Sequence, residues 1–355
     1  MKKIVCMMLI IVVAINCVAC KGTNESSKND STGKTSVESA GGGSDNSSKD
    51  NSSPIKIAVT PWNPCMFLNL AEELGYFDEV GVNVDLVDFA EFNDVPTAFN
   101  AGQIDGAFFS SFEVIAPASL GVDLKVVAVA DNSVGADGLL ASSEYTTLEE
   151  LKGHTIGVGL DTISHIYLLL LLEEEGYLAD DFELVDMSAS ARATALITGQ
   201  IDATAVFEPF ISSILSEGDD INVISDTSVY PKMINDCIAF SGAAVENRRE
   251  DIVKIMTCWY KAIEYWENNT EEATEIMAGL LEVTPEDFVE TMTKLEMVSA
   301  EDCLEQLTPS DSADYWGNRA DTISTFLLER GMIKNEVDGN SCLDNSIVQS
   351  ILEQE

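Results

Sequence analysis

The sequence predicts an α/β protein whose chain forms two similar lobes. Short β-branched segments alternate with segments of helical period over residues 54–241, an order that indicates mostly parallel sheets with helices on their faces. The four residues Gly-Gln-Ile-Asp also occur twice, at 102–105 and at 199–202, each time between a helical segment and an apolar strand. Each copy connects a helix to the strand that follows it, and these two connections are the repeated joints, 102–105 and 199–202. Their matching surroundings indicate two lobes with the same order of strands and helices.

The elements expected for the first lobe follow one another along the chain. Apolar residues recur at strand or helix period, and glycines or prolines stand at the ends of the segments. Strands are expected at 54–60, 82–89, 104–109 and 124–130, and helices at 65–77, 95–102 and 111–121.

The second lobe repeats the scheme, and a helical region follows it. Strands are expected at 154–159, 182–187, 201–207, 221–226 and 237–242, and helices at 162–176, 191–199 and 208–218. Further helices are expected at 249–269, 270–282, 284–295 and 313–331, where they most simply pack back on the first lobe.

The repeated joint has a simple structural explanation. Gly102 and Gly199 suit the left-handed residue that ends a helix. The aspartates that follow, Asp105 and Asp202, are expected to hydrogen-bond nearby backbone and to fix the turn into the next strand.

Charge and cysteine content exclude some classes of function. The chain has 61 acidic and 19 basic residues, a formal net charge of −42, which repels polyanions and argues against nucleic-acid binding. No cysteine spacing resembles a metal site, so we expect no metal and no cofactor. We expect the body cysteines to be buried and free, with a Cys303–Cys342 bridge as the alternative; they are Cys65, Cys237, Cys258, Cys303 and Cys342.

The N-terminus predicts export and anchoring. A basic start and a short apolar run form a signal peptide over residues 1–20, and the small Ala19 stands before Cys20, as in the lipobox of lipoproteins. We therefore expect Cys20 to be lipidated, although Cys17 stands where such sequences usually have leucine. Residues 21–53 are polar and almost without aliphatic side chains, which predicts a disordered tether outside the cytoplasmic membrane.

Segments 75–89, 98–107, 151–177 and 195–209 together resemble the nitrate-, sulfonate- and taurine-type substrate-binding proteins of ABC importers. That superfamily also includes binders of thiamine pyrimidine precursors. The resemblance implies a type-II periplasmic-binding-protein fold, in which two mixed or parallel-sheet lobes enclose a ligand cleft. It places lobe one at 54–143 and 238–355 and lobe two at 144–237, with crossovers near 142–147 and 234–240.

Candidate ligand-binding residues follow the strands of the first lobe, because ligands of open α/β sheets bind beyond the carboxyl ends of the strands. Trp62 supplies an aromatic surface and fits either a cleft wall or a core position. The polar candidates of this lobe are Asn63, Ser110, Ser111, Asn132 and Ser133, the last two of which turn chemistry explains equally well.

In the second lobe the segment GLDTISH offers a helix start that suits an oxyanion. The resemblance places ligand contacts on Thr162, Ser164 and His165, and a structural role for His165 is the alternative. Asp161 and Glu208 add carboxylates that oppose an anion, and Asp161 also suits a helix cap. Because the candidates include no lysine or arginine, unless Arg192 is one, a neutral or cationic solute is as acceptable as a sulfonate.

The resemblance implies a monomeric solute receptor that captures a small polar solute, sulfonate- or pyrimidine-like, by closure of its lobes. Its partners would be an ABC permease and an ATPase, and it would act at the outer side of the cell membrane. The alternatives are an enzyme on the same fold and a ligand-sensing subunit of a membrane receptor. Related enzymes work in the cytosol and one group has a cysteine-rich motif that this chain lacks, so we expect no enzymatic activity.

Overall fold

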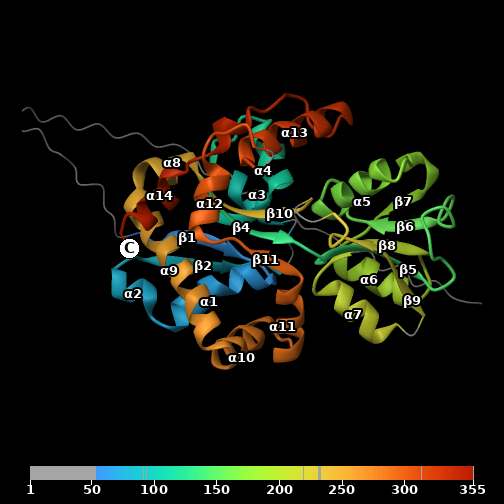
Figure 1. Cartoon of the computed structure of the whole chain (residues 1–355), viewed down its shortest axis with the longest axis horizontal. Helices are drawn as coiled ribbons and strands as arrows, with labels where there is room; N and C mark the ends of the chain where they lie inside the picture. Colours follow the sequence, from blue (N-terminus) through green and yellow to red (C-terminus); the bar gives the residue numbers. More distant parts are fainter. Residues whose placement is uncertain are drawn as a thin grey trace, which may run out of the picture. The chain divides into compact units, whose positions relative to one another are not determined.

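The computed structural model describes residues 53–354, except 91, 93, 219, 231, 232 and 313. These residues belong to the compact unit Asp50–Glu355, shown in Figure 1. The predicted signal peptide, Cys20 and almost all of the predicted tether lie outside the described residues, so these remain predictions. None of the helices within the described residues has the length and apolar character that a membrane span requires.

The first sheet has six strands in the order β11-β4-β10-β3-β1-β2. β1 pairs in parallel with β2 and β3, whereas β10 runs antiparallel to both β3 and β4. The strands are β1 (Ile55–Val59), β2 (Val84–Asp88), β3 (Gly106–Ser110), β4 (Leu124–Ser133), β10 (Asn235–Ser241) and β11 (Leu295–Met297). The connecting helices are α1 (Met66–Glu73), α2 (Tyr76–Val80), α3 (Asp94–Asn100) and α4 (Ser111–Ala118).

The second sheet has five strands in the order β7-β6-β8-β5-β9. β6 pairs in parallel with β7 and β8, whereas β5 runs antiparallel to both β8 and β9. The strands are β5 (Asp137–Ser142), β6 (Thr155–Val158), β7 (Glu183–Asp186), β8 (Ala203–Phe207) and β9 (Ile221–Asp226). The helices are α5 (Ile163–Glu174), α6 (Ala189–Ile197) and α7 (Phe210–Glu217).

The two sheets therefore share one topology. The order β2-β1-β3-β10-β4 corresponds strand by strand, with the same directions, to β7-β6-β8-β5-β9. One strand of each lobe, β10 or β5, runs against the strand that follows the repeated joint. The sequence repeat thus marks two lobes of equal construction, each a mixed sheet, as the predicted fold requires.

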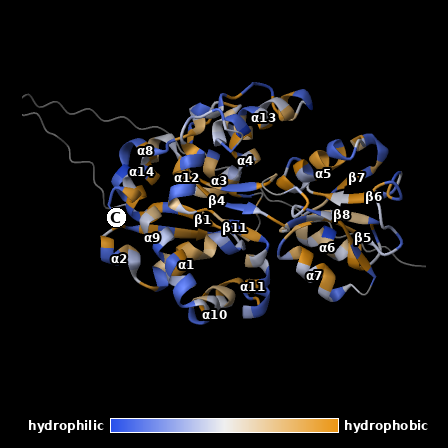
Figure 2. Ribbon diagram, in the orientation of Figure 1, coloured by the Kyte–Doolittle hydropathy of each residue, from blue (hydrophilic) through white to orange (hydrophobic). Residues whose placement is uncertain are grey.

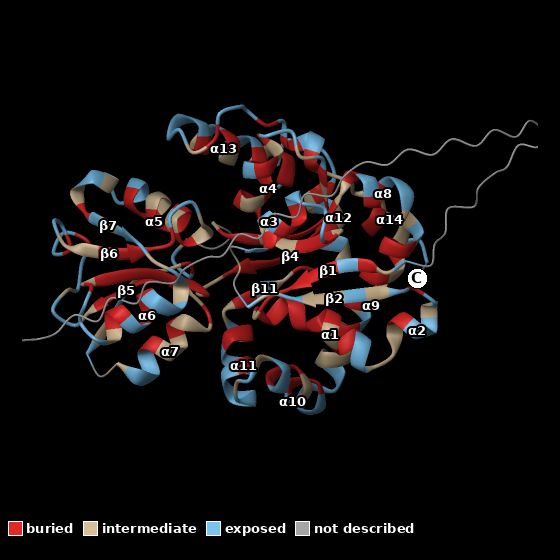
Figure 3. Ribbon diagram, turned by 180° about the vertical axis from the view of Figure 1, so that it is seen from behind, coloured by how far each residue is buried: buried red, intermediate tan, exposed pale blue. Residues whose placement is uncertain are grey.

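The C-terminal helices pack on the first lobe, as predicted. α9 contacts α1, α2, α10 and α14, and the Trp259 indole donates to the carbonyl of Pro64 over 3.2 Å. These helices are α8 (Gly242–Asn247), α9 (Arg249–Asn268), α10 (Thr270–Leu281), α11 (Pro285–Thr293), α12 (Ala300–Leu307), α13 (Trp316–Glu329) and α14 (Ser346–Leu352). Figure 2 shows hydrophilic residues on the outer faces of the helices, and Figure 3 shows that the central strands of both sheets are buried.

The chain crosses between the sheets earlier at both places than the sequence predicts. The expected boundaries at 143 and 237 assigned residues 137–142 to the first lobe, but β5 belongs to the second sheet. The crossings therefore lie at 134–136 and 227–234. Gly135 adopts a φ of 129° at the first crossing, and its amide donates to Thr227 Oγ1 at the second, over 2.8 Å.

The repeated joints have matching geometry. Gly102 and Gly199 have φ values of 65° and 67°, which confirms the predicted left-handed helix ends. The carboxylate of Asp105 accepts from the amide of Lys56 over 2.8 Å, and that of Asp202 accepts from the amide of Thr155 over 2.9 Å. Each aspartate therefore ties the joint to the first parallel strand of its own lobe.

Replacing either joint aspartate by alanine should lower the free energy of unfolding by about 1–2 kcal/mol, because a backbone amide loses its charged acceptor. Asp105→Ala and Asp202→Ala are expected to behave alike in urea unfolding. Asp311→Ala is the control, since this exposed aspartate makes no side-chain hydrogen bond to the described residues. A loss of stability in only one of the two variants would contradict the equivalence of the two joints.

Candidate ligand-binding site

A cavity of about 770 Å³, counted with the solvent at its mouth, lies between the strand ends of the two sheets. The carboxyl ends of parallel strands are where open α/β sheets bind ligands. Its walls come from both lobes: Thr60, Trp62, Phe92, Phe108, Phe109, Ser110, Glu113, Asp137, Thr162, Ile163, Ala189, Arg192, Phe207, Ile234 and Asp236.

Aromatic rings from the two lobes meet at this cavity. The ring of Phe207, at the end of β8, lies 5.1 Å from that of Phe92 and 6.4 Å from that of Trp62, in edge-to-face geometry. Such ring pairs contribute about 0.5–1.5 kcal/mol beyond their buried area. The cavity therefore has an apolar, flat-sided wall that suits a ring or a compact alkyl group.

A row of carboxyl groups crosses the first sheet beside this wall. Asp236 of β10 stands directly opposite Asp131 of β4, and on its other side opposite Ser110 of β3. Like charges at directly opposed positions of neighbouring strands destabilise a sheet. Asp131 is almost completely buried, whereas Asp236 lines the cavity.

The second lobe places an aspartate at the equivalent position. Asp137, the first residue of β5, stands directly opposite Phe207 of β8, as Asp236 stands opposite Ser110 of β3. Ser110 and Phe207 end the strands that follow the two repeated joints. The cavity thus receives one aspartate from the crossing strand of each lobe.

Burial dominates the ionisation of these groups. It raises the pKa of Asp137 from 3.8 to about 6, with the charge of Glu208 adding to the effect. Burial and neighbouring carboxylates also raise the pKa of Asp131 and Asp236, and the Trp62 indole opposes this only in part. Burial likewise raises the pKa of Glu113 on the cavity wall. Acids held in this way are typical of functional sites.

Two buried polar atoms, one on the cavity-wall residue Trp62 and one on Asp131 behind the wall, form no hydrogen bond of ordinary geometry within the described residues. They are the indole Nε1 of Trp62, whose residue is 6% exposed, and Oδ2 of Asp131, whose residue is 1% exposed. Buried polar atoms in native proteins are nearly always paired. The Trp62 N–H instead acts on the neighbouring carboxyl groups of Asp131 and Asp236, whose pKa it lowers in part.

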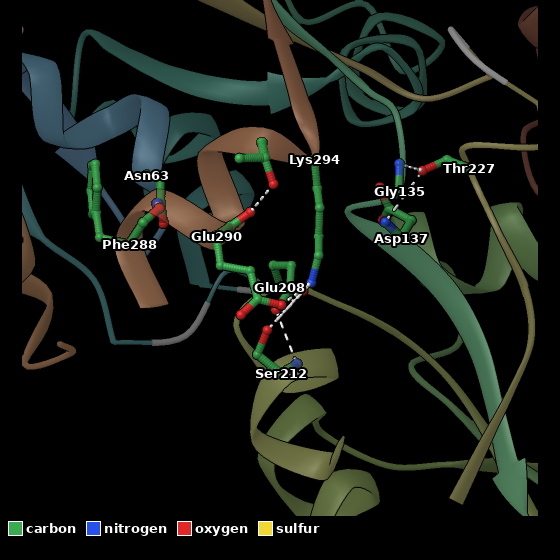
Figure 4. A network of polar contacts seen from close by, with 10 residues as sticks. Asn63, Gly135, Asp137, Glu208, Ser212, Thr227, Phe288, Glu290 and Lys294 are labelled. Atoms are coloured by element: carbon green, nitrogen blue, oxygen red, sulfur yellow. Dashed lines mark hydrogen bonds and ion pairs between the residues drawn. The ribbon is translucent and has the colours of Figure 1, made fainter. Parts of the chain in front are cut away.

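The basic groups nearest to the cavity bind protein atoms. The guanidinium of Arg192 donates to the carbonyls of Ala205 and Met187 and to Ser164 Oγ, over 2.8–3.0 Å. Lys294 Nζ lies 2.5 Å from an oxygen of the fully buried Glu208 and 3.1 Å from one of Glu290 (Figure 4). Glu208 also accepts from the amide and hydroxyl of Ser212, so its pairing is complete.

Of the candidates in the first lobe, the structure places Trp62 and Ser110 on the cavity wall and the others elsewhere. Ser111 turns into the core, where it accepts from the Trp316 indole over 3.0 Å and donates to Asn235. The amide of Asn63 donates to the carbonyl of Phe288, as Figure 4 shows. Ser133 bonds Thr227 between the crossings, and Asn132 lines a different hollow beside β11. These side chains therefore bind protein groups or line another surface, and do not line this cavity.

In the second lobe Thr162 is the candidate that lines the cavity, as N-cap of α5. Its hydroxyl donates to the Gly159 carbonyl over 2.7 Å. Ser164 is buried against Arg192, and His165 lines a separate hollow. His165 Nδ1 accepts from the amide of Asp161, consistent with burial lowering the histidine pKa. The remaining two candidates do not line this cavity: Asp161 borders a separate hollow, and Glu208 is paired with Lys294.

The sequence candidates omitted several wall residues. Asp236 is the second residue of an antiparallel strand, so a search of residues that follow parallel strands does not find it. Phe92 comes from the loop before α3. The sequence does contain a signal for Asp137 and Arg192, because each is a charged residue next to an apolar segment. No group of metal ligands occurs among the described residues.

Comparison with known proteins supports a binding function. A family model described as NMT1/THI5 like matches residues 63–273, more than half of the chain. A protein of Brucella abortus described as a binding protein is 26% identical over 76% of this chain and 83% of its own length. A Bacillus subtilis protein described as an aliphatic sulfonates-binding protein is 22% identical, over 89% and 93%.

Solved structures share the fold. The periplasmic aliphatic sulphonate-binding protein SsuA of Escherichia coli matches with a TM-score of 0.70, at 18% identity, over 82% of this chain and 92% of that chain. SsuA of Xanthomonas axonopodis pv. citri, bound to MOPS, matches with a TM-score of 0.69, at 17% identity, over 82% and 98%. The desulfurization enzyme DszB also matches, with a TM-score of 0.61, at 15% identity, over 85% and 99%. The predicted fold and the resemblance to substrate-binding proteins are confirmed.

Asp137→Asn should make protein stability less sensitive to pH. Because folding raises the pKa of Asp137 from 3.8 to about 6, its protonated form stabilises the fold below pH 3.8, and this contribution is lost as the pH rises through 6. The groups facing it are Asp131, Asp236, Glu208 and Tyr167. The stability of the variant relative to wild type should rise by about 2 kcal/mol from pH 4 to pH 7.

Urea unfolding at pH 4, 5, 6 and 7 measures this difference. Asp311→Asn provides the control, because its exposed side chain leaves the profile unchanged. A constant difference between Asp137→Asn and wild type across these pH values would contradict the burial of a titrating carboxyl at this position.

Proposed function

Since the chain belongs to the NMT1/THI5-like family, we propose that it is the extracytoplasmic solute-binding component of an ABC importer. The observation that carries this function is a cavity walled by equivalent strand ends of two lobes of one topology. A solute held there contacts both lobes at once. It therefore stabilises the arrangement in which the lobes meet over any arrangement in which they are apart.

Direct contacts between the lobes support such closure. Phe207 of the second lobe touches Trp62 and Phe92 of the first, and Lys294 pairs with Glu208. Small domain interfaces of this kind are compatible with hinge motion, and the two crossings at 134–136 and 227–234 are the natural hinges. The permease and the ATPase of the importer are the proposed partners of the closed form.

A catalytic role on the same fold is the second candidate, because the desulfurization enzyme DszB shares it. A related structure is a cysteine-to-serine mutant of DszB in complex with biphenyl-2-sulfinic acid. Here the described cysteines are buried, and none of them lines the cavity. Burial raises the pKa of Cys65 and Cys237 to about 12, so neither supplies a thiolate at neutral pH. These properties favour binding over thiol catalysis.

Lipid anchoring through Cys20 is the proposed link to the membrane. The signal-like run before Ala19 and Cys20, and the polar segment after them, support it. A lipid chain contributes about 0.8 kcal/mol per buried methylene, which keeps the receptor near its permease.

Cys20→Ser should move the protein from the membrane fraction to the soluble extracytoplasmic fraction. Cys17→Ser is the matched control, because it leaves Ala19 and Cys20 intact and should stay with the membranes. Immunoblots of fractionated cells measure both variants. Retention of Cys20→Ser in the membranes, with Cys17→Ser released, would move the anchor to Cys17.

The importer role is tested by a solute screen followed by uptake. Residues 54–355 are screened for thermal stabilisation by amines, sulfonates, pyrimidines and nitrate; a solute at 100 times its dissociation constant adds about 2.7 kcal/mol. Phe92→Ala should weaken the best solute at least tenfold, because the ring forms the cavity wall. Phe326→Ala is the control, since this partly buried phenylalanine of α13 does not line the cavity.

Uptake of that solute by cells should fall with the Phe92→Ala chain and not with the Phe326→Ala chain. Conversion of the solute to a product by the purified protein would favour the enzyme. Unchanged uptake with Phe92→Ala, despite lost binding, would favour a sensing subunit over an importer component.

A further inference from the structure

We propose that Asp137 and Asp236 hold a cationic nitrogen group, so that the solute is a compact organic cation with a flat or alkyl body. The inference rests on the proposed function and specifies the class of its solute. It departs from the sulfonates that the names of several relatives carry.

The position of the two aspartates is the first argument. Asp137 is the first residue of β5 and Asp236 the second of β10, and each stands opposite the last residue of the strand that follows a repeated joint. Both line the cavity, and their charges act on each other. A cation between them meets a carboxylate from either lobe, and this charge-assisted pairing is the strong form of hydrogen bond.

The charge balance of the walls is the second argument. Glu113, Asp137 and Asp236 line the cavity, and Asp131 lies behind Asp236 in the same row of the sheet. Arg192 is the basic residue among the wall residues, and its guanidinium donates to Ala205, Met187 and Ser164. An anion would enter beside several carboxyls, whereas a cation compensates them.

The wall itself is the third argument, and it is independent of the acids. Phe92, Phe207 and Trp62 present ring surfaces, and aromatic rings attract organic cations placed over their faces. The Trp62 N–H lies beside Asp131 and Asp236 and opposes in part the rise of the pKa of both carboxyl groups.

The start of α5 and the positive charge of Arg192 are the features that favour an anion. Thr162 and Ile163 lie on the cavity wall at the N-terminus of this helix, where free amides attract negative charge. Glu113 and Asp137 share the same cavity, so a negative group bound there would be repelled by both. We therefore expect the helix start to contact a neutral acceptor of the solute, and the acids to decide the sign of its charge.

The test compares solutes that differ only in the head group. Benzylammonium, phenylmethanesulfonate and benzyl alcohol share one ring, and methylammonium and methanesulfonate share one methyl group. Calorimetric titration of residues 54–355 at pH 7.5 should show benzylammonium binding at least tenfold more tightly than the sulfonate and the alcohol. Methylammonium should likewise exceed methanesulfonate.

Isosteric variants then show which carboxyl groups hold the ammonium group. Asp137→Asn and Asp236→Asn should each weaken benzylammonium at least tenfold and leave benzyl alcohol within twofold, and Asp311→Asn should change neither. The inference is overturned if a sulfonate binds more tightly than the ammonium ion, if all head groups bind equally, or if neither ammonium ion binds. So does an unchanged benzylammonium affinity in both cavity variants.

These failures are distinct from failure of the proposed function. If a sulfonate binds and Phe92→Ala abolishes its uptake, the importer role stands and only the charge assignment falls. Thermal unfolding of the unliganded variants shows whether they are folded, and a folded Asp236→Asn keeps the test valid if Asp137→Asn unfolds.

Discussion

The structure depends on the burial of carboxyl groups where two sheets face each other. Asp131 and Asp236 stand directly opposite on neighbouring strands, and Asp137 meets them from the other lobe. Desolvation and mutual repulsion both disfavour such an arrangement, and replacement by neutral residues would stabilise the fold. Proteins keep costly groups of this kind mainly where function needs them. The cavity, its charge and the role of the lobes all follow from this constraint.

Topology explains why the acids arrive in this place. In each lobe the strand after the repeated joint ends at the cavity, and an antiparallel crossing strand begins beside that end. Asp236 and Asp137 occupy these beginnings. The same topology makes the crossings at 134–136 and 227–234 connect the lobes, so the aspartates lie within a few residues of the hinges.

Much of the fold was predictable from the sequence, and less of the site. Alternating strands and helices, and the glycines Gly102 and Gly199, determine the lobes through local conformational preferences. Trp62, Ser110 and Thr162 were found because they follow parallel strands. Asp236 was not a candidate, since it lies within an antiparallel strand whose pairing is long-range. Two further candidates bind protein groups instead: Ser111, whose side chain points to Trp316, and Glu208, which pairs with Lys294.

The contacts between the lobes divide into two kinds with different consequences. The pair Lys294–Glu208 and the ring contacts of Phe207 form between protein groups alone, so they favour closure whatever the solute. In the described arrangement the charge of Asp137 raises the pKa of Asp236, so the two carboxyl groups resist being ionised together. The proposed cation would stabilise both ionised forms at once, because it contacts a carboxylate from each lobe. Binding and closure are then coupled by the charge of the solute, as a receptor that reports occupancy requires.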